Sequence, residues 1–204
     1  MAEVKFLVKR GDYDIDAMFP QKLDGEIDFL SCDEGTADLL YGFVRALRPD
    51  AVLETGTHKG RSTQAIASAL VANDHGYMIT IDKDDYKTLP IALSKDEQAR
   101  VKAVVGETPH VFNNTSWFKD AKIGFAFLDG AHDWATVSEE IDFVRSNMGD
   151  ECLVAIDNTR DEGWPQLREG MDRYTIDDNI SLNTCCGIDL IWLRSTDAQD
   201  VASA

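Results

Sequence analysis

Apolar residues along this chain fall into two alternating patterns, which are short continuous runs and helical stripes. The runs predict seven buried strands, at residues 51–54, 77–81, 101–105, 123–128, 152–156, 180–184 and 188–193. Between the strands, apolar residues three and four apart predict helices at residues 34–47, 62–72, 89–99 and after residue 132. Strands that alternate with helices and end in a hairpin predict an α/β fold, with a mostly parallel sheet and one antiparallel strand.

The pattern predicts one domain, because no internal repeat and no low-complexity linker interrupts it. We assign this domain to residues 33–196, with an N-terminal arm at 1–32 and a polar tail at 197–204. Within the arm, alternating apolar residues at 4, 6 and 8 predict a short strand. The arm could cover an active site, pair with a second subunit in a homodimer, or form a loose extension.

A glycine turn follows the first strand and leads into a helix. The strand ends on Glu54, Gly56 and Gly60 are four residues apart, and a helical pattern begins at Ser62. A strand–turn–helix unit of this kind presents backbone N–H groups and a positive helix end to a ligand. Dinucleotide turns have a G-x-G-x-x-G spacing, and Glu54 would repel a pyrophosphate. The carboxylate would attract a cation, which favours S-adenosylmethionine (SAM) over NAD.

The next two strand ends carry further candidates for binding a nucleotide cofactor. Asp82 ends the second strand, about 20 residues after the turn, where an acid accepts hydrogen bonds from ribose hydroxyls. Either SAM or NAD carries a ribose, so Asp82 does not distinguish them. The third strand is followed by Gly106, Glu107 and Thr108, which could reach an adenine edge or belong to a surface loop.

Acids also follow the fourth and fifth strands, and here the pattern indicates a metal. Asp129 follows the fourth strand, and Asp157 and Asn158 follow the fifth. Ligands of open parallel sheets bind beyond the carboxyl ends of the strands, so these residues should meet at one edge. Three hard oxygen donors suit Mg²⁺ or Ca²⁺ rather than zinc, and the like charges need a cation or a hydrogen-bonding ligand nearby.

The composition limits the classes of molecule that this protein is expected to bind. The net charge of -17 disfavours nucleic acids and anionic membranes, and is compatible with a small-molecule enzyme or with solubility alone. No apolar run is long enough to span a bilayer, and residues 1–10 do not resemble a signal peptide. The four cysteines form no C-x-x-C pair, which is typical of reduced thiols in a cytoplasmic protein.

These motifs together resemble class I SAM-dependent methyltransferases, particularly metal-dependent O-methyltransferases of the catechol and caffeoyl-CoA type and the group acting on macrolide sugars. The resemblance covers residues 35–194 and implies a doubly wound, Rossmann-like seven-stranded sheet. It is carried by Val-Leu-Glu-Thr-Gly (52–56) with Gly60 and Ser62, by Asp82, by Phe-Leu-Asp-Gly-Ala-His (127–132) and by Ile-Asp-Asn (156–158). It implies that SAM and a divalent cation are bound. The predicted cofactor set is Glu54, Gly56, Thr57, Gly60, Ser62, Asp82, Gly106, Glu107, Thr108 and Asp129, and the metal set is Asp129, Asp157 and Asn158.

One position departs from the catechol-type pattern. Those enzymes carry a catalytic lysine three residues after the first metal aspartate, where this chain has His132. An Asp-Gly-x-His pattern resembles the sugar-modifying relatives and favours a hydroxyl on a sugar or natural product. His132 and Asp129 are therefore the catalytic candidates, with His132 taking the acceptor's proton. Trp134 and Trp164 flank this region and could wall the acceptor or pack in the core.

Three other functions stay open from the sequence. A metal-independent SAM methyltransferase would use Asp129 and Asp157 as cofactor contact and base. A nicotinamide dehydrogenase is disfavoured by Glu54, by the glycine spacing and by the lack of a suitably placed Tyr-x-x-x-Lys pair. A SAM-binding protein without catalysis would share the cofactor site and differ in turnover.

Overall fold

The computed structural model describes residues 32–85, 93–113, 115–174, 179–182, 184 and 186–195. A seven-stranded sheet runs through it in the order β3-β2-β1-β4-β5-β7-β6. Neighbouring strands pair in parallel except for β7, which is antiparallel to both β5 and β6. The predicted doubly wound sheet with one antiparallel strand is confirmed. The strands are β1 Ala51–Thr55, β2 Tyr77–Asp82, β3 Val101–Val105, β4 Ile123–Leu128, β5 Met148–Asp157, β6 Asn179–Leu182 and β7 Ile188–Arg194.

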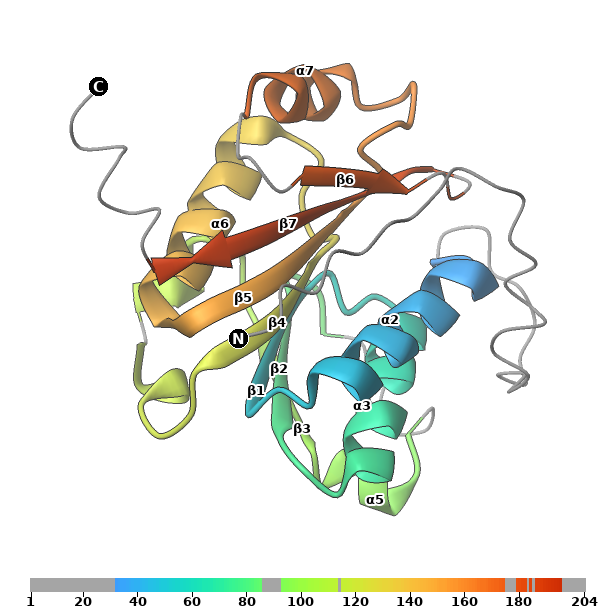
Figure 1. The fold of residues 1–204 in the computed structure, drawn as a ribbon, viewed down its shortest axis with the longest axis vertical. Helices are drawn as coiled ribbons and strands as arrows, with labels where there is room; N and C mark the ends of the chain where they lie inside the picture. The colour runs from blue at the N-terminus through green and yellow to red at the C-terminus, as the bar shows by residue number, and fades with distance from the viewer. Residues whose placement is uncertain are drawn as a thin grey trace, which may run out of the picture.

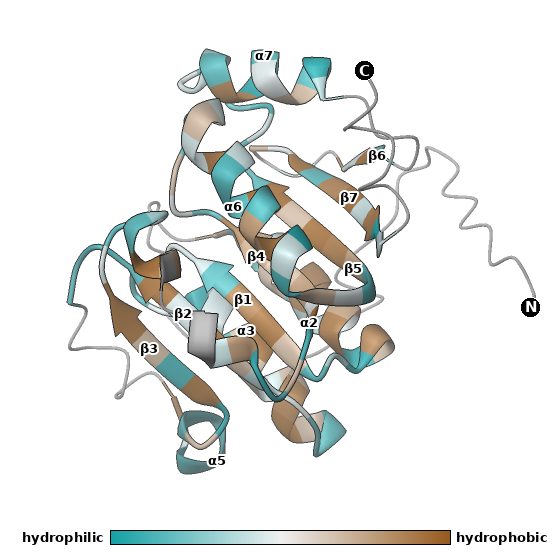
Figure 2. Cartoon of the chain, turned by 90° about the vertical axis from the view of Figure 1, so that its left-hand side faces the viewer, coloured by the Kyte–Doolittle hydropathy of each residue, from teal (hydrophilic) through white to brown (hydrophobic). Residues whose placement is uncertain are grey.

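Helices cover both faces of the sheet (Figure 1). The sheet therefore separates two apolar clusters of the core. On one face, Leu40 of α2 (Glu34–Leu47) and Ile66 of α3 (Arg61–Asn73) pack in one apolar cluster with strand residues. On the other, Val137 of α6 (Trp134–Asn147) and Leu167 of α7 (Pro165–Arg173) belong to a second cluster. The strands between them are largely apolar (Figure 2), which is expected for parallel strands buried on both faces.

Local chemistry sets the helix starts. Asp33 caps α2, because its carboxylate accepts the backbone N–H of Thr36 at 2.9 Å. Asp133 caps α6 in the same way through Thr136, also at 2.9 Å. Gly60 precedes α3 with φ 87°, a left-handed conformation that glycine adopts without strain. The glycine turn therefore leads directly into the helix, as its sequence predicts.

Two predicted elements differ in extent from the structure, and two short turns were not predicted. β5 begins at Met148 rather than at residue 152, because Met148 pairs with Ile123 and Glu151 with Arg194. The predicted helix at 89–99 is described from residue 93 on, as α5 (Lys95–Gln98), whose capping box starts it at Ser94. Two short 3₁₀ turns, His110–Asn113 and Thr115–Phe118, follow β3. The strand predicted within residues 4–8 lies outside the described residues, and the division into arm, domain and tail stays a prediction.

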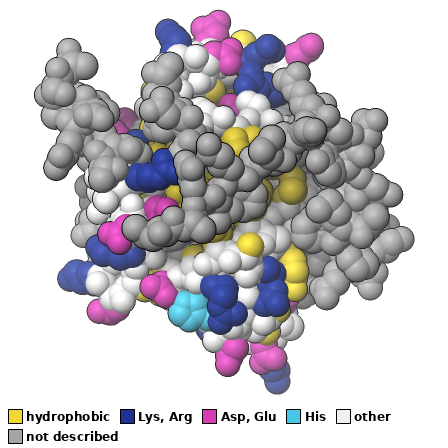
Figure 3. Space-filling view, viewed as in Figure 1, with side chains coloured by type: hydrophobic (Ala, Val, Ile, Leu, Met, Phe, Trp, Pro, Cys, Tyr) yellow, Lys and Arg dark blue, Asp and Glu magenta, His cyan; other side chains and the backbone are white. Residues whose placement is uncertain are grey.

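The surface is mixed in charge despite the net charge of -17. On the face shown in Figure 3, Lys and Arg side chains alternate with Asp and Glu side chains over the described surface. Within the described part of the chain, no helix has the length and apolar character needed to cross a membrane.

Candidate active site

The strand register brings the predicted acids to one edge of the sheet. Thr55 is level with Ile81 of β2 and with Leu128 of β4, and Leu128 is level with Ile156 of β5. The residues that follow these positions are Asp82, Gly56, Asp129 and Asp157, which lie on four adjacent strand ends. This is the edge at which open parallel sheets bind ligands.

The glycine turn packs directly on the Asp129 backbone. Gly56 has φ +86°, and a Cβ there would lie 2.4 Å from the Asp129 carbonyl oxygen. The turn is tightened by the Gly60 N–H, which donates to the Thr57 carbonyl at 2.8 Å. Asp82 holds it from β2, where its carboxylate accepts the His58 N–H at 2.9 Å. A small pocket lies between the turn and Asp129, and its lining includes Gly56, Thr57, Gly60, Ser62 and Cys32.

Glu54 is completely buried beneath this turn. Its Oε2 accepts the Thr63 hydroxyl at 2.6 Å, while its Oε1 has no hydrogen-bond partner. Burial raises the pKa of Glu54 to about 7, although hydroxyls of Thr63, Thr80 and Ser62 act in the opposite direction. The ionised carboxylate is thus held at a cost that a nearby positive charge would reduce.

Asp129 and Asp157 form a pair of carboxylates on adjacent strand ends. Burial and then the Asp157 charge raise the pKa of Asp129 well above its usual range. The pKa of Asp157, which is 7% exposed, is raised to about 6, mainly by burial. Among the described residues, neither carboxylate takes part in an ion pair. Asn158 follows with φ 60°, a left-handed conformation that asparagine tolerates better than most residues.

The described residues contain no group of three or more His, Cys, Asp or Glu side chains that could hold a metal ion. The predicted set differs in kind, because it has two carboxylates and the amide oxygen of Asn158. Hard oxygen donors of this type suit Mg²⁺ or Ca²⁺. Two buried like charges on neighbouring strands also favour a cation between them. The donor chemistry therefore fits a divalent ion.

His132 lies under an indole ring at the edge of the site. The imidazole stacks on Trp164 with ring centroids 4.6 Å apart and an interplanar angle of 30°. Burial lowers the pKa of His132, while Asp161 and Asp133 act to raise it. Its Nδ1 is buried and has no hydrogen-bond partner. The lowered pKa favours the neutral form of the ring near pH 7.

The two tryptophans at the site have different roles. Trp164 is 43% exposed and lies over His132, so one of its faces is open to a ligand. Trp134 is partly buried and packs against the core, where its ring lies 5.3 Å from that of Tyr174. A Cβ on Gly170 would lie 2.2 Å from the Trp134 ring, which shows how closely α6 and α7 approach. Trp134 is therefore part of the helix–helix contact.

In the segment after β3, neighbouring residues differ in burial and in their contacts. Gly106 has φ +158°, and its N–H donates to the Asp82 carbonyl at 2.8 Å. Glu107 is exposed, as expected of a loop residue. The Thr108 hydroxyl donates to a buried acid, Glu140 of α6, at 2.5 Å. The Glu140 carboxylate therefore holds the Thr108 side chain in place.

The sequence reading missed two residues near the site. Cys32 lines the pocket, and the pKa of its thiol is raised well above its usual range, by burial and by Asp129. No pattern in the sequence indicates this position. Glu140 is fully buried, and its pKa is raised to about 7 by burial. Its spacing, three residues after Val137 and four before Val144, places it on the apolar stripe of α6 and could have identified it.

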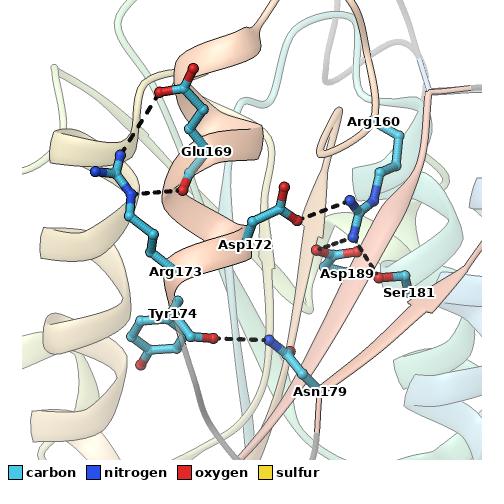
Figure 4. Close-up of polar contacts among 8 residues, drawn as sticks. All are labelled: Arg160, Glu169, Asp172, Arg173, Tyr174, Asn179, Ser181 and Asp189. Atoms are coloured by element: carbon cyan, nitrogen blue, oxygen red, sulfur yellow. Dashed lines mark hydrogen bonds and ion pairs between the residues drawn. The ribbon is translucent and has the colours of Figure 1, made fainter.

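An ion-pair network fixes the loop that follows Asn158 (Figure 4). Arg160 bonds to Asp172 of α7 at 3.2 Å and to Ser181 of β6 at 2.8 Å. It also lies 3.5 Å from Asp189 of β7, which is 3% exposed. The Arg160 N–H donates to the Cys186 carbonyl at 3.0 Å. The loop that carries Trp164 is therefore anchored to the antiparallel side of the sheet.

Comparison with known proteins gives a family match over the site. A family model described as "Methyltransferase domain" matches residues 53–159, about half of the chain and all five strand ends discussed above. No curated protein matches this chain by sequence.

Solved structures share the fold at low sequence identity. The O-methyltransferase TomG from Streptomyces achromogenes, solved with SAM, superposes with TM-score 0.68 and 18% identity, over 93% of this chain and 92% of TomG. An O-methyltransferase from Bacillus cereus, solved with SAH, superposes with TM-score 0.70 and 15% identity, over 82% of this chain and 84% of that enzyme. CalS11, a TDP-rhamnose 3'-O-methyltransferase of calicheamicin biosynthesis, superposes with TM-score 0.60 and 17% identity, over 78% of this chain and 76% of CalS11. Likeness at this identity shows the fold alone.

Proposed function

Because this chain belongs to the methyltransferase domain family, we propose that it is a SAM-dependent O-methyltransferase assisted by a divalent cation, acting on a hydroxyl of a sugar or natural product. The observation that carries this proposal is the Asp129–Asp157 pair, which adjoins the glycine turn on the next strand end. One edge of the sheet thereby offers a place for a sulfonium cofactor and, beside it, a place for a hard cation.

The cofactor would lie over the glycine turn. Gly56 and Gly60 would allow backbone N–H groups to approach it, and Asp82, at the end of β2 beside the turn, would accept a hydrogen bond from a ribose hydroxyl. Glu54 places a buried carboxyl group beneath the turn, and a cationic ligand would favour its charged form, whereas a phosphate would not. TomG and the Bacillus cereus enzyme support this assignment, because their structures contain SAM and SAH.

Asp129, Asp157 and Asn158 would hold the cation. A bound divalent ion lowers the pKa of an acceptor hydroxyl and fixes its oxygen. His132 would take the hydroxyl proton, because burial keeps its ring neutral and its Nδ1 has no other partner. The methyl group then passes from sulfur to oxygen, which leaves SAH and a methyl ether. The exposed face of Trp164, next to His132, offers an apolar surface for a sugar or aromatic ring.

The proposal is tested first by binding and then by turnover. Calorimetry with SAH is expected to give one site per chain, and NADH none. Radiolabelled methyl transfer from SAM to a panel of sugars, nucleotide sugars and phenols is then measured with Mg²⁺ and with a chelator. Transfer that needs Mg²⁺ supports the proposal, and a chain that binds NADH and not SAH contradicts it.

One observation favours a metal-independent variant of this function. The raised pKa values of Asp129 and Asp157 allow the pair to share a proton, which relieves their repulsion without a metal ion. Asp129 could then act as the base. Transfer that is unaffected by the chelator would favour this variant over the metal-assisted one.

A further inference from the structure

Glu140 is a buried acid that the proposed chemistry does not use. It lies in the middle of α6 and is completely buried, among residues that otherwise form an apolar stripe. Burying a carboxylate costs free energy unless its oxygens accept hydrogen bonds. Both Glu140 oxygens do so, and their two donors come from two different strand ends.

The first contact reaches the end of β1. Thr55 Oγ1 donates to Glu140 Oε2 at 3.2 Å. The same Thr55 oxygen accepts the Gly130 N–H at 3.3 Å, and the Thr55 carbonyl accepts the Asp129 N–H at 3.0 Å. Glu140 therefore orients the hydroxyl that fixes the Asp129–Gly130 peptide against the glycine turn.

The second contact reaches the segment after β3. Thr108 Oγ1 donates to Glu140 Oε1 at 2.5 Å. This segment also contains Gly106, whose N–H is bonded to the Asp82 carbonyl. One side chain of α6 thus holds the strand end beside the proposed ribose contact and the strand end beside the proposed methyl-transfer edge.

We infer that Glu140 is a positioning residue for the cofactor: it fixes Thr108 and, through Thr55, the Asp129–Gly130 peptide, so that the adenosine and sulfonium ends of SAM meet a preformed surface. This inference rests on the proposed function, because it takes SAM as the ligand. It predicts that Glu140 affects affinity for the cofactor without touching it. Asp133 is the charged neighbour that most affects Glu140, and Asp133 is occupied in capping α6.

The experiment measures SAH affinity by calorimetry in wild type, E140Q, E140L, T108V and the double variant E140Q/T108V. E140L removes both acceptors and is expected to weaken SAH binding about tenfold or more, and E140Q, which keeps one acceptor oxygen, about threefold. The loss in the double variant should be smaller than the sum of the two single losses, because both substitutions disrupt the Glu140–Thr108 contact.

Two controls on the same helix separate positioning from general destabilisation. E139Q changes the exposed acid next in sequence and should leave SAH affinity unchanged. V144A opens a cavity in the buried stripe, so its melting temperature should fall while its SAH affinity does not change. All affinities are measured well below the melting temperature of each variant.

The outcomes are distinct. If wild type does not bind SAH, the proposed function fails before this inference is reached. If wild type binds and the E140Q and T108V losses simply add, Glu140 does not act through Thr108 and the inference is overturned. It is also overturned if E140L, or E140Q where E140L does not fold, binds SAH as tightly as wild type. A loss in V144A equal to that in the Glu140 variants would show a merely structural role and overturn it too.

Discussion

The two halves of the candidate site hold their negative charges in different ways. On the β1–β2 side, Glu54 is buried among hydroxyl donors, of which Thr63 is bonded to it at 2.6 Å. On the β4–β5 side, Asp129 and Asp157 lie on adjacent strand ends, and burial together with the Asp157 charge raises the pKa of Asp129. Side-chain hydroxyls thus partly stabilise the charge of Glu54, whereas a backbone hydrogen bond from Asn158 favours the charged form of Asp157.

This difference indicates which half is preorganised. Hydroxyl donors and a glycine turn can keep one shape with or without a ligand, so the β1–β2 half needs little change to bind a cofactor. Two adjacent buried carboxylates need a proton or a cation before both can be close together. We therefore expect cofactor affinity to depend on the first half, and metal and proton dependence to depend on the second.

The substitution with the largest expected effect is D157A, in the β4–β5 half of the site. Removal of one carboxylate of the pair should lower methyl transfer about 100-fold or more, because a cation that activates the hydroxyl contributes several kcal/mol. SAH affinity should change little. Transfer rates with added Mg²⁺, together with calorimetry, check both parts. D157N is the matched control, since it keeps an oxygen donor and should lose less activity.

The variant T63V tests the β1–β2 half of the site. It removes the hydroxyl that Glu54 Oε2 accepts, and leaves a buried carboxylate with less support. SAM affinity should fall about tenfold, and the free energy of unfolding by about 1–3 kcal/mol. T63S, which keeps the hydroxyl, should restore most of both. Calorimetry and chemical denaturation measure the two effects, and equal SAM affinity in T63V and wild type would contradict the role of Glu54.

A pH dependence of stability follows from the raised pKa values. Glu54 and Glu140 have pKa values of about 7 in the folded protein, compared with roughly 4.3 when unfolded. Between these values the folded state binds more protons, so the free energy of unfolding falls as pH rises from about 4.5 to about 7. Denaturation curves across this range, without ligand, should show the decrease. E140Q should reduce it, and a free energy that rises with pH in both proteins would contradict the assignment.

W164A is expected to have the smallest effect. Without the indole cover, water reaches His132 and its lowered pKa returns toward the usual value. The acidic limb of the pH–rate profile should then move to higher pH, with a few-fold loss of rate near pH 6.5 and little change at pH 8. W164F, which keeps an aromatic ring, should retain the wild-type profile. Equal profiles in W164A and wild type would show that the stacking does not affect the base.

Most of the fold could be predicted from the sequence, because strand ends are marked chemically as well as by hydropathy. Buried runs ending in Glu54, Asp82, Asp129 and Asp157 indicated both the strands and their shared edge. The start of β5 was wrong by several residues. Gly149, Asp150 and Glu151 lack strand propensity. The strand extends back to Met148 because Met148 pairs with Ile123 at the start of β4 and Glu151 pairs with Arg194 of β7.

The site could be predicted only where a residue follows a strand. Glu140 was missed because a charged residue in a helix is usually exposed, and its burial depends on Thr55 and Thr108, which are distant in sequence. Trp134 is next to the site in sequence, yet it packs closely against Gly170 of α7 and lies partly buried against the core. Contacts of this kind depend on tertiary packing, and no local pattern contains them.

The stacked pair of Trp164 and His132 has a practical consequence. Of the four tryptophans, Trp164 is the exposed one, and its ring lies 4.6 Å from an imidazole. An imidazolium quenches indole emission more strongly than a neutral imidazole does. Fluorescence of the unlabelled protein can therefore follow protonation of the proposed base, and the arrival of an acceptor over the indole, in a cuvette before any product is identified.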